Sequence, residues 1–335
     1  GQVKALITYA ANPVLSVPNG RRLDKAIEGL DFMVSIDIYI NETTRHADII
    51  LPPASTLAED HADFFFANYN VRDVMRWSDS LVEKKAGERL DWEILLALAE
   101  GLGGGITAMR PVDAILRTLG ISLTPEDIAT SALRMGPFGD RFLPWSKGLN
   151  RARLRESPHG VDLGPLKPGF QRRVFHRGKR IHLDHPPINA AMSALLGEIQ
   201  NPEPGRLLLI GRRSLRSNNS WMHNVPKLVA GKDRCVLYIH PKDADRAGAK
   251  SGDSLIMESR VHRGPVPIHV TDEVREGVVS LPHGFGHGGL SRWQKTASAR
   301  PGVSVNDWTD DAEVEAIVGQ SILNGVPVQL HPMES

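Results

Sequence analysis

The order of strands and helices in the first 108 residues most constrains the fold of this chain. An apolar run at Val3–Tyr9 is typical of a buried strand, and Leu23–Leu30 has the spacing of a short amphipathic helix. Further strands are predicted at Asp31–Ile38 and Ala47–Leu51, and Asp91 is predicted to cap a helix that ends near Gly101. Strands that alternate with helices predict a parallel, doubly wound sheet, whose ligands bind beyond the carboxyl ends of the strands.

A different pattern begins near residue 206. Five short β-type runs are separated by turn residues, and such regular spacing predicts a compact all-β barrel with short helices. The runs are Arg206–Gly211, Arg234–Ile239, Ser254–Ser259, Val266–Val270 and Gly277–Leu281. We therefore predict three parts: an α/β domain at 1–108, a connecting segment with short helices at 109–205, and an all-β barrel domain at 206–335.

The predicted connecting segment contains a basic stretch. Ten Lys or Arg residues stand against two acids between Lys147 and Arg180, a local charge of +8. One interpretation is a surface that faces an anion, and the other is a solvated linker. We favour the linker, because like charges in stretches rich in Pro and Gly are usually exposed.

Composition narrows the class of protein. The net charge of the 335 residues is only +1, so the whole-chain charge gives no sign of a nucleic-acid partner, and no apolar run is long enough to insert into a membrane. Cys235 is the single cysteine, which excludes an intrachain disulfide and a cysteine-bound iron–sulfur cluster in these residues. We expect a cytoplasmic location, unless an upstream part carries an export signal. An opening without Met that leads directly into a core strand suggests a piece of a larger protein.

Three polar residues stand at ends of the predicted elements in the first part. Asn12 follows the first strand, Asp37 ends the second, and Asp91 begins the helix. An Asn amide offers two donors and an acceptor, enough to read a base edge or to hold a phosphate oxygen. Each residue also has a plain structural role available to it, as a turn residue or a helix cap.

The first strand of the predicted barrel leads into a polar loop. Gly211, Arg212, Arg213, Asn218 and Asn219 belong to a run of basic and small polar residues that ends at Trp221. Backbone N–H groups and side chains of this type suit a loop that wraps a pyrophosphate.

Taken in order and spacing, these segments closely resemble the molybdopterin oxidoreductase family, which includes formate dehydrogenases, nitrate reductases and dimethyl sulfoxide reductase. Glu42-Thr43, Ala47-Asp48 and Leu51-Pro52 carry the resemblance in the first part, and Gly211-Arg212 through Glu276-Gly277 carry it in the last. The resemblance covers the chain except for a thin region at about 110–200. It implies the C-terminal half of such an enzyme, ending in a six-stranded double-psi barrel.

The resemblance also implies a cofactor and the residues that contact it. The cofactor is bis(molybdopterin guanine dinucleotide) with Mo or W, while a [4Fe-4S] cluster is expected in the missing N-terminal half. The expected cofactor-binding residues are Asn12, Asp37, Asp91, Gly211, Arg212, Asn218, Asn219, Phe285 and Asn306. No catalytic residue and no metal ligand is expected in this chain. Asp60 departs from the pattern, because some members have a phosphate-binding Lys at this position.

The motif His283-Gly284-Phe285-Gly286-His287-Gly288-Gly289 leaves two interpretations. Histidines are common zinc ligands, but the four glycines disfavour a helix that would align the two side chains. No acid or thiol lies nearby in the sequence. We favour a loop that lines the dinucleotide, and we interpret Cys235 as a small buried hydrophobic residue.

Two functions remain in view. The first is binding of the guanosine and pyrophosphate ends of the cofactor, as part of a Mo- or W-dependent oxidoreductase that resembles formate dehydrogenase or nitrate reductase. Its partners would be the N-terminal half of the same enzyme and electron-transfer subunits, and this segment alone would be inactive. The second is a non-catalytic nucleotide-binding or assembly subunit. The substrate is not indicated by these residues.

Overall fold

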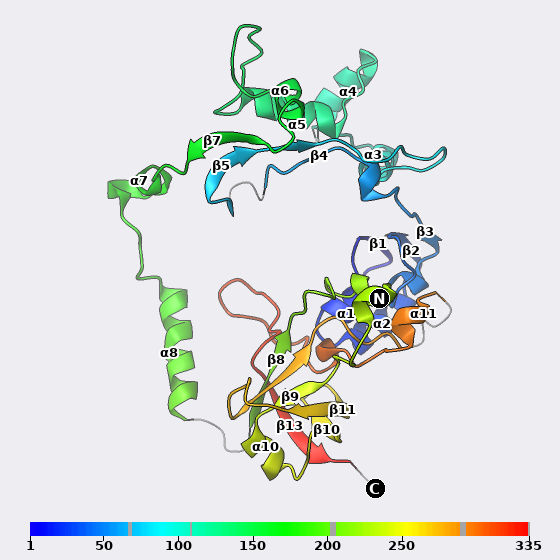
Figure 1. The fold of residues 1–335 in the computed structure, drawn as a ribbon, viewed down its shortest axis with the longest axis vertical. Helices are drawn as coiled ribbons and strands as arrows, with labels where there is room; N and C mark the ends of the chain where they lie inside the picture. The colour runs from blue at the N-terminus through cyan, green and yellow to red at the C-terminus, as the bar shows by residue number, and fades with distance from the viewer. Residues whose placement is uncertain (66–68, 108, 202–205, 289–292, 334–335) are drawn as a thin grey trace. The chain divides into compact units, whose positions relative to one another are not determined.

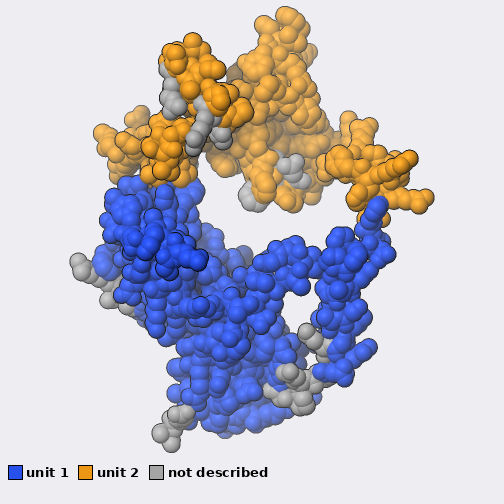
Figure 2. Space-filling model, turned by 180° about the vertical axis from the view of Figure 1, so that it is seen from behind, with its two compact units in different colours: residues 1–51, 182–335 blue, residues 52–181 orange. Residues whose placement is uncertain are grey.

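The computed structural model describes residues 1–65, 69–107, 109–201, 206–288 and 293–333 (Figure 1). The chain divides into two compact units. Unit 1 combines residues 1–51 with 182–335, and unit 2 contains residues 52–181 (Figure 2). The predicted boundaries near 108 and 205 stay predictions, since compactness groups the first 51 residues with the barrel.

A three-stranded parallel sheet forms the first part of unit 1, as predicted. Its strands lie in the order β1 (Ala5–Tyr9), β2 (Phe32–Ile36) and β3 (Ile49–Ile50). The parallel registers pair Ala5 with Phe32 in the first two strands and Val34 with Ile49 in the next two. Helices α1 (Pro13–Ser16) and α2 (Gly20–Glu28) connect β1 to β2, and the 3-10 helix η1 (Thr44–His46) precedes β3. Asp48 has a structural role, because its carboxylate accepts the Met33 N–H at 2.7 Å.

The second part of unit 1 is a closed barrel of six strands, which confirms the predicted all-β domain. Its strands follow one another around the barrel in the order β10-β11-β9-β12-β8-β13 and mix parallel with antiparallel pairs. The strands are β8 (Leu207–Arg212), β9 (Leu237–Ile239), β10 (Ser254–Glu258), β11 (Arg263–Val270), β12 (Val278–Pro282) and β13 (Val326–Pro332). The short helices are η5 (Trp221–Asn224), α9 (Pro226–Val229), α10 (Pro241–Arg246), α11 (Lys295–Ser298) and η6 (Val305–Asp307).

The barrel core is apolar and tightly closed. Leu209, Leu237, Met257, Val266 and Val279 are fully buried in it. In β10 and β11 the buried residues alternate with more exposed ones, as expected for a strand with one face in the core. Burying side chains of this size stabilises a fold by about 1.5–3 kcal/mol each. The barrel is therefore the firm base from which the loops after β8 and β12 extend.

The parallel sheet and the barrel are joined by polar contacts. Asn19 N–H is bonded to the carbonyls of Asn306 and Thr309, and the Arg21 guanidinium pairs with Asp307 at 2.9 Å. Asn306 itself is 2% exposed and donates to Leu15 O at 2.7 Å. These contacts explain why unit 1 includes residues distant in the sequence.

Unit 2 is a helical layer with two small antiparallel sheets. Its strands are β4 (His61–Ala62) with β6 (Trp77–Ser78), and β5 (Arg72–Met75) with β7 (Val161–Pro165). Its helices are η2 (Thr56–Ala58), α3 (Asp91–Gly101), α4 (Arg110–Thr118), α5 (Pro125–Met135), α6 (Arg151–Arg155), α7 (Phe170–Arg173) and η4 (Arg177–Lys179). Asp91 is the first helical residue of α3, not its cap, and Glu93 accepts the Leu90 N–H at 2.7 Å.

The chain returns from unit 2 through α8 (Pro186–Gln200), which belongs to unit 1. Most residues from 165 to 197 are exposed, which agrees with the linker interpretation of the basic stretch where the two overlap. Of the described helices, none is both long and apolar enough to cross a membrane.

Candidate functional site

The loop after β8 has an unusual backbone. Asn218 and Asn219 are exposed and both adopt positive φ, +40° and +59°, a region that Asn tolerates better than most residues. Gly284, in the loop after β12, has φ +92°, and a Cβ there would overlap the Asn219 carbonyl. The Arg213 guanidinium donates to Asn219 Oδ1 at 2.6 Å. The loops after β8 and β12 are thus in close contact, and their backbones depend on Asn and Gly.

Arg212 and Gly211 stand at the start of this loop and hold it to the barrel. The Arg212 guanidinium lies 3.6 Å from the centre of the Tyr238 ring and donates to the carbonyls of Ser280 and Val236. Burial lowers the pKa of Arg212 from its usual value. Gly211 N–H donates to Asn324 Oδ1 at 2.8 Å. In this structure both predicted contact residues already have partners inside the protein.

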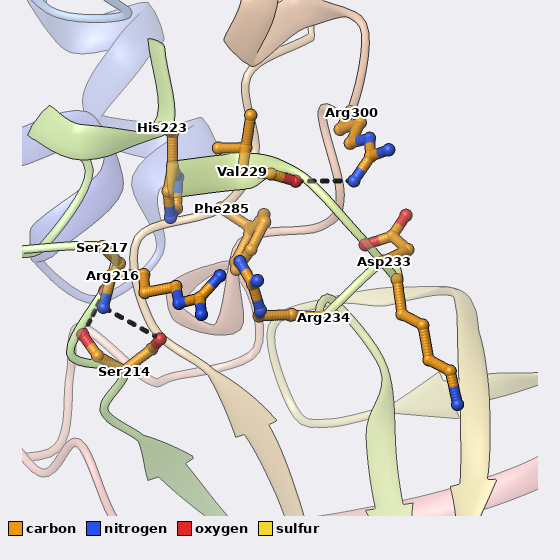
Figure 3. Close-up of a pocket in the computed structure, with 10 residues that line it drawn as sticks. Ser214, Arg216, Ser217, His223, Val229, Asp233, Arg234, Phe285 and Arg300 are labelled. Carbon is orange, nitrogen blue, oxygen red and sulfur yellow. Dashed lines mark hydrogen bonds between the residues drawn. The ribbon is translucent and has the colours of Figure 1, made fainter. Parts of the chain in front are cut away.

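A pocket opens beside the loop, and four of its ten lining residues are cations (Figure 3). We call it the basic pocket; its lining residues are Ser214, Arg216, Ser217, His223, Val229, Lys232, Asp233, Arg234, Phe285 and Arg300. It contains about 430 Å³ of space free of protein atoms, part of it open to solvent. Of the predicted cofactor-binding residues, only Phe285 lines it.

The charges of the basic pocket do not balance. Four cations, Arg216, Lys232, Arg234 and Arg300, face one acid, Asp233, which leaves a formal charge of +3 with His223 neutral. Figure 3 shows the guanidinium groups of Arg216 and Arg234 facing the same space. Two positive charges that face the same space repel each other, so an anion bound between them would be stabilised.

Two of these arginines also shape the pocket wall. Arg234 donates to the carbonyls of Leu228 and Ala230, and Arg300 donates to those of Val229 and Gly231. Together they hold the turn after α9. Among the described residues, Arg216 and Lys232 carry no side-chain hydrogen bond of this kind, so they are the cations best placed to contact a ligand.

Behind the pocket wall lies a buried chain of hydrogen bonds. His223 Nδ1 is 2.8 Å from His287 Nε2, and His287 Nδ1 is 3.0 Å from Glu42 Oε1. Asn12 Nδ2 donates to the other Glu42 oxygen at 2.7 Å, and Thr43 Oγ1 donates to Asn12 Oδ1 at 2.8 Å. All five residues are less than a tenth exposed. We call this set the Glu42 chain; it crosses from the parallel sheet to the barrel loops within unit 1.

His223 is the member of the Glu42 chain that reaches the basic pocket. Its ring packs on Phe285 with centroids 4.2 Å apart. Burial, with a contribution from the neighbouring His287, lowers the pKa of His223 to about 4. At neutral pH this ring is therefore uncharged, despite the carboxylate two steps away.

Asn12, Asp37 and Asn306 are buried and have hydrogen-bond partners inside the protein. Asn12 belongs to the Glu42 chain, and Asn306 bonds to the backbone of Leu15. Asp37 is 5% exposed, and its oxygens accept hydrogen bonds from Tyr39 N–H and Asn41 Nδ2. Burial raises the pKa of Asp37, and these hydrogen bonds oppose the rise.

Two further positions belong to unit 2. Asp91 begins α3, and its contact with the cofactor stays a prediction. Asp60, where the sequence departs from the family pattern, is an internal anchor. It accepts hydrogen bonds from Trp77 Nε1, Arg151 and Arg155. The acid at this position thus has a structural role.

The structure also bears on the cysteine and on a metal. Cys235 is 1% exposed, and burial raises the pKa of its thiol to about 12, so the prediction of a buried hydrophobic residue is confirmed. Within the described ranges, no three His, Cys, Asp or Glu side chains gather in a way that could hold a metal ion. Gly289, which ends the His-Gly motif, lies outside the described residues.

Sequence reasoning misses the cations of the basic pocket and the partners of His287. Arg216 lies within the polar loop after β8, but Lys232, Arg234 and Arg300 come from segments without a motif. The sequence near His287 contains no acid, whereas in the fold Glu42 reaches it across 245 positions of sequence. Local patterns contain no signal for contacts of such sequence separation.

Comparisons with known families match two parts of the chain. Residues 1–101 match the model described as molybdopterin oxidoreductase. Residues 207–327 match the model described as molydopterin dinucleotide binding domain, which includes the loop after β8 and the basic pocket.

Relatives and a solved structure agree with these matches. A formate dehydrogenase 1 subunit alpha of Methanococcus maripaludis is 26% identical over 85% of this chain and 39% of its own length. The assimilatory nitrate reductase catalytic subunit of Bacillus subtilis is 35% identical over 31% of the chain and 14% of its own length. Acetylene hydratase from Pelobacter acetylenicus has a TM-score of 0.63 at 17% identity, covering 98% of this chain and 44% of that one, and so shows the fold alone. The chain spans less than half the length of each.

Proposed function

Because this chain belongs to the molybdopterin oxidoreductase family, we propose that unit 1 holds the pyrophosphate and guanosine ends of a molybdopterin guanine dinucleotide cofactor. One observation carries the proposal: a pocket with a formal charge of +3 lies beside the exposed Asn218-Asn219 loop, inside the residues that match the dinucleotide-binding model. The donor set fits the group, since guanidinium and ammonium groups suit phosphate oxygens. When bound, the cofactor supplies the redox chemistry of Mo or W.

Within this proposal the residues divide into two roles. Arg216 and Lys232 would contact phosphate oxygens, while Asn219 and Asn218 would offer amides and backbone N–H groups from the loop. Arg212 and Gly211 would keep the loop in place through the partners that they already have. Five further residues remain proposed contacts on the basis of the family resemblance: Asn12, Asp37, Asp91, Phe285 and Asn306.

The parent enzyme would be an oxidoreductase that resembles formate dehydrogenase or nitrate reductase. The chain would work with the remainder of that enzyme and with electron-transfer subunits. The names of the relatives support this class, because one is a formate dehydrogenase subunit and another is the catalytic subunit of a nitrate reductase. The substrate remains outside the proposal.

Binding of guanosine diphosphate to the 335-residue chain tests the phosphate contacts. We expect GDP to bind and guanosine to bind at least tenfold more weakly by calorimetry, because a charge-assisted phosphate contact contributes about 1.5–3 kcal/mol. Arg216→Ala should weaken GDP binding about tenfold. The matched control is Lys227→Ala, which removes an exposed cation on α9 that does not line the pocket. Equal loss in both variants would contradict a pocket-specific site.

Metal content tests the cofactor itself. In the full-length parent protein, Asp37→Ala and Asn219→Ala should each lower the Mo or W retained after purification. A parent with neither metal would contradict the function, and unchanged metal in both variants would contradict the residue assignment.

A further inference from the structure

The Glu42 chain has a fixed hydrogen-bond direction at one end. Asn12 Nδ2–H donates to Glu42 Oε2, because the Asn12 oxygen is already taken by Thr43. A carboxylate only accepts, so His287 Nδ1 must carry a proton and donate to Glu42 Oε1. Glu42 therefore accepts a hydrogen bond from Asn12 on one side and from His287 on the other. What stays open is the proton between the two imidazoles.

Two proton states satisfy this geometry. When both rings are neutral, His223 Nδ1–H donates to His287 Nε2, and His223 Nε2 carries a lone pair. When one proton is added from solvent at His223 Nε2, the shared central proton is free to move to His287 Nε2. The positive charge then stands on His287 beside the Glu42 carboxylate. The two states differ by one proton at the ring nitrogen of His223 that is not bonded to His287.

We propose that the His223–His287 pair, paired with Glu42, takes up one proton when an anion enters the basic pocket. The inference rests on the proposed function for the presence of an anion in that pocket. It adds a coupling between anion binding and proton uptake, which the proposed function does not require. His223 connects the two, because it lines the pocket and is bonded to His287.

The charges around His223 explain why the anion is needed. Arg216 and Arg234 line the same pocket as His223, and their charges disfavour a further positive charge when the pocket holds no anion. His287 and His283, in the loop after β12, also lower the pKa of His223. Glu42 and the backbone of Gly284 favour the protonated ring, and Asp233 is the one acid among the residues that line the pocket. Burial is the largest cause of the low pKa of His223 and outweighs these groups. An anion beside Arg216 reverses this balance.

The pH dependence of sulfate binding tests the coupling. Sulfate keeps its charge between about pH 5 and pH 7.5, unlike phosphate, and no Arg or Lys titrates there. If one proton is taken up, the affinity for sulfate should rise by up to about tenfold for each pH unit of acidification. This rise is expected between the pKa that the proton-accepting group has in the sulfate-bound protein and the pKa that it has in the free protein. Calorimetry at one pH in two buffers of different ionisation enthalpy should show the same uptake directly, with no substitution. A flat profile with no uptake overturns the proposal.

Glu42→Gln identifies the group that stabilises the added charge. This variant keeps the size of the side chain but removes the charge beside His287. Sulfate should still bind, and its affinity should change at least threefold less per pH unit than in the wild type. The matched control is Asp243→Asn, a buried carboxylate of α10 that is 4% exposed and does not line the basic pocket. It should keep the wild-type slope. A slope that survives in Glu42→Gln, or is lost equally in the control, overturns the role of Glu42.

Two substitutions separate the titrating histidine from its neighbour. His223→Gln should abolish the proton uptake, whereas His283→Gln should leave it in place. Proton uptake that disappears in His283→Gln alone would overturn the assignment to the His223–His287 pair. Failure of the wild-type chain to bind sulfate at any pH would overturn the anion pocket, and with it both this coupling and the phosphate contacts proposed above. Sulfate binding without uptake overturns the coupling alone.

Discussion

Unit 1 and unit 2 each contain a carboxylate that is largely withdrawn from solvent, and the two carboxylates are satisfied in opposite ways. Asp60 in unit 2 is paired with two arginines, which stay charged at every physiological pH. Glu42 in unit 1 is held by the Asn12 amide and by the imidazole of His287, which is hydrogen-bonded to a second imidazole, that of His223. The first arrangement suits permanent structure. The second leaves a proton that can move, and it lies behind the pocket to which we assign function.

Removal of Asp60 should produce the largest effect. Asp60→Ala leaves Arg151 and Arg155 without their shared carboxylate and Trp77 Nε1 without its acceptor, so we expect a loss of about 3 kcal/mol in the free energy of unfolding of unit 2. Hydrogen exchange, followed by mass spectrometry, should show faster exchange in peptides from 52–181. Peptides from the barrel strands should keep their protection. Uniform change across both units would contradict a local role for Asp60.

The elements of the two units show how far the sequence alone reaches. Strand alternation and turn residues predict the parallel sheet and the barrel, because these patterns are local and each strand contains its own signal. The strand β13 is not predicted, since Val326–Pro332 contains two prolines and lacks the Val and Ile density of its neighbours. Residues 110–165 fall in the predicted connecting segment, yet Leu133, Leu149 and Leu154 pack with Trp77 in a core of unit 2.

The site residues also divide into those with a local sequence signal and those that only the fold brings together. The composition of the loop after β8 predicts a binding loop, and its Asn residues do adopt the strained backbone that such loops use. Glu42 enters the sequence argument only as part of a family motif, because its partner His287 lies far along the chain. A charge cluster assembled from three separate segments leaves no local pattern either. Contacts of this kind depend on the closure of the whole fold.

The next largest expected effect is that acidification destabilises unit 1 at a higher pH than unit 2. Burial lowers the pKa of His223 to about 4, so below pH 6.5 the unfolded chain binds a proton that the folded chain does not. Stability from this residue is full above pH 6.5 and is lost as the pH falls toward 4, by roughly 2–3 kcal/mol in unit 1. Burial raises the pKa of Asp60, but the hydrogen bonds from Ser80, Trp77 and Arg151 outweigh it and lower the pKa overall. Its contribution to unit 2 is therefore lost only as the pH falls below 3.8 and through the lowered pKa.

The measurement is unfolding by urea at about pH 7, 5.5 and 4.5, with hydrogen exchange to assign each transition to a unit. His223→Gln should flatten the dependence in unit 1 and leave unit 2 unaffected. Parallel losses in both units of the wild-type chain over this range would contradict the distinction between the two carboxylate environments.

Truncation of Glu42 should have a smaller effect than that of Asp60. Glu42→Ala leaves the N–H groups of His287 and Asn12 without acceptors in a buried site, and we expect a loss of about 2 kcal/mol in unit 1. Glu42→Gln should lose about 1 kcal/mol, because the amide still offers one acceptor. Thermal unfolding of the two variants beside the wild type gives the order. A larger loss of stability for Glu42→Gln than for Glu42→Ala would show that the new amide N–H destabilises the site. That result would contradict the claim that Glu42 stabilises unit 1 by accepting hydrogen bonds from His287 and Asn12.

Cys235 provides a third environment and the smallest expected effect, because it is a buried titratable group without an ionic partner among the described residues. Its thiol accepts the Val303 N–H at 3.2 Å, and burial raises its pKa to about 12. The thiolate is the nucleophile, so alkylation by iodoacetamide at about pH 8 should be at least a hundredfold slower in the folded chain than in urea. Cys235→Ala should lose only about 1 kcal/mol, since the hydrogen bond is weak and the deleted group is small. Fast alkylation under native conditions would show that this part of the barrel opens. In that case the loop that carries Gly302 and Val303 would not stay packed against Cys235.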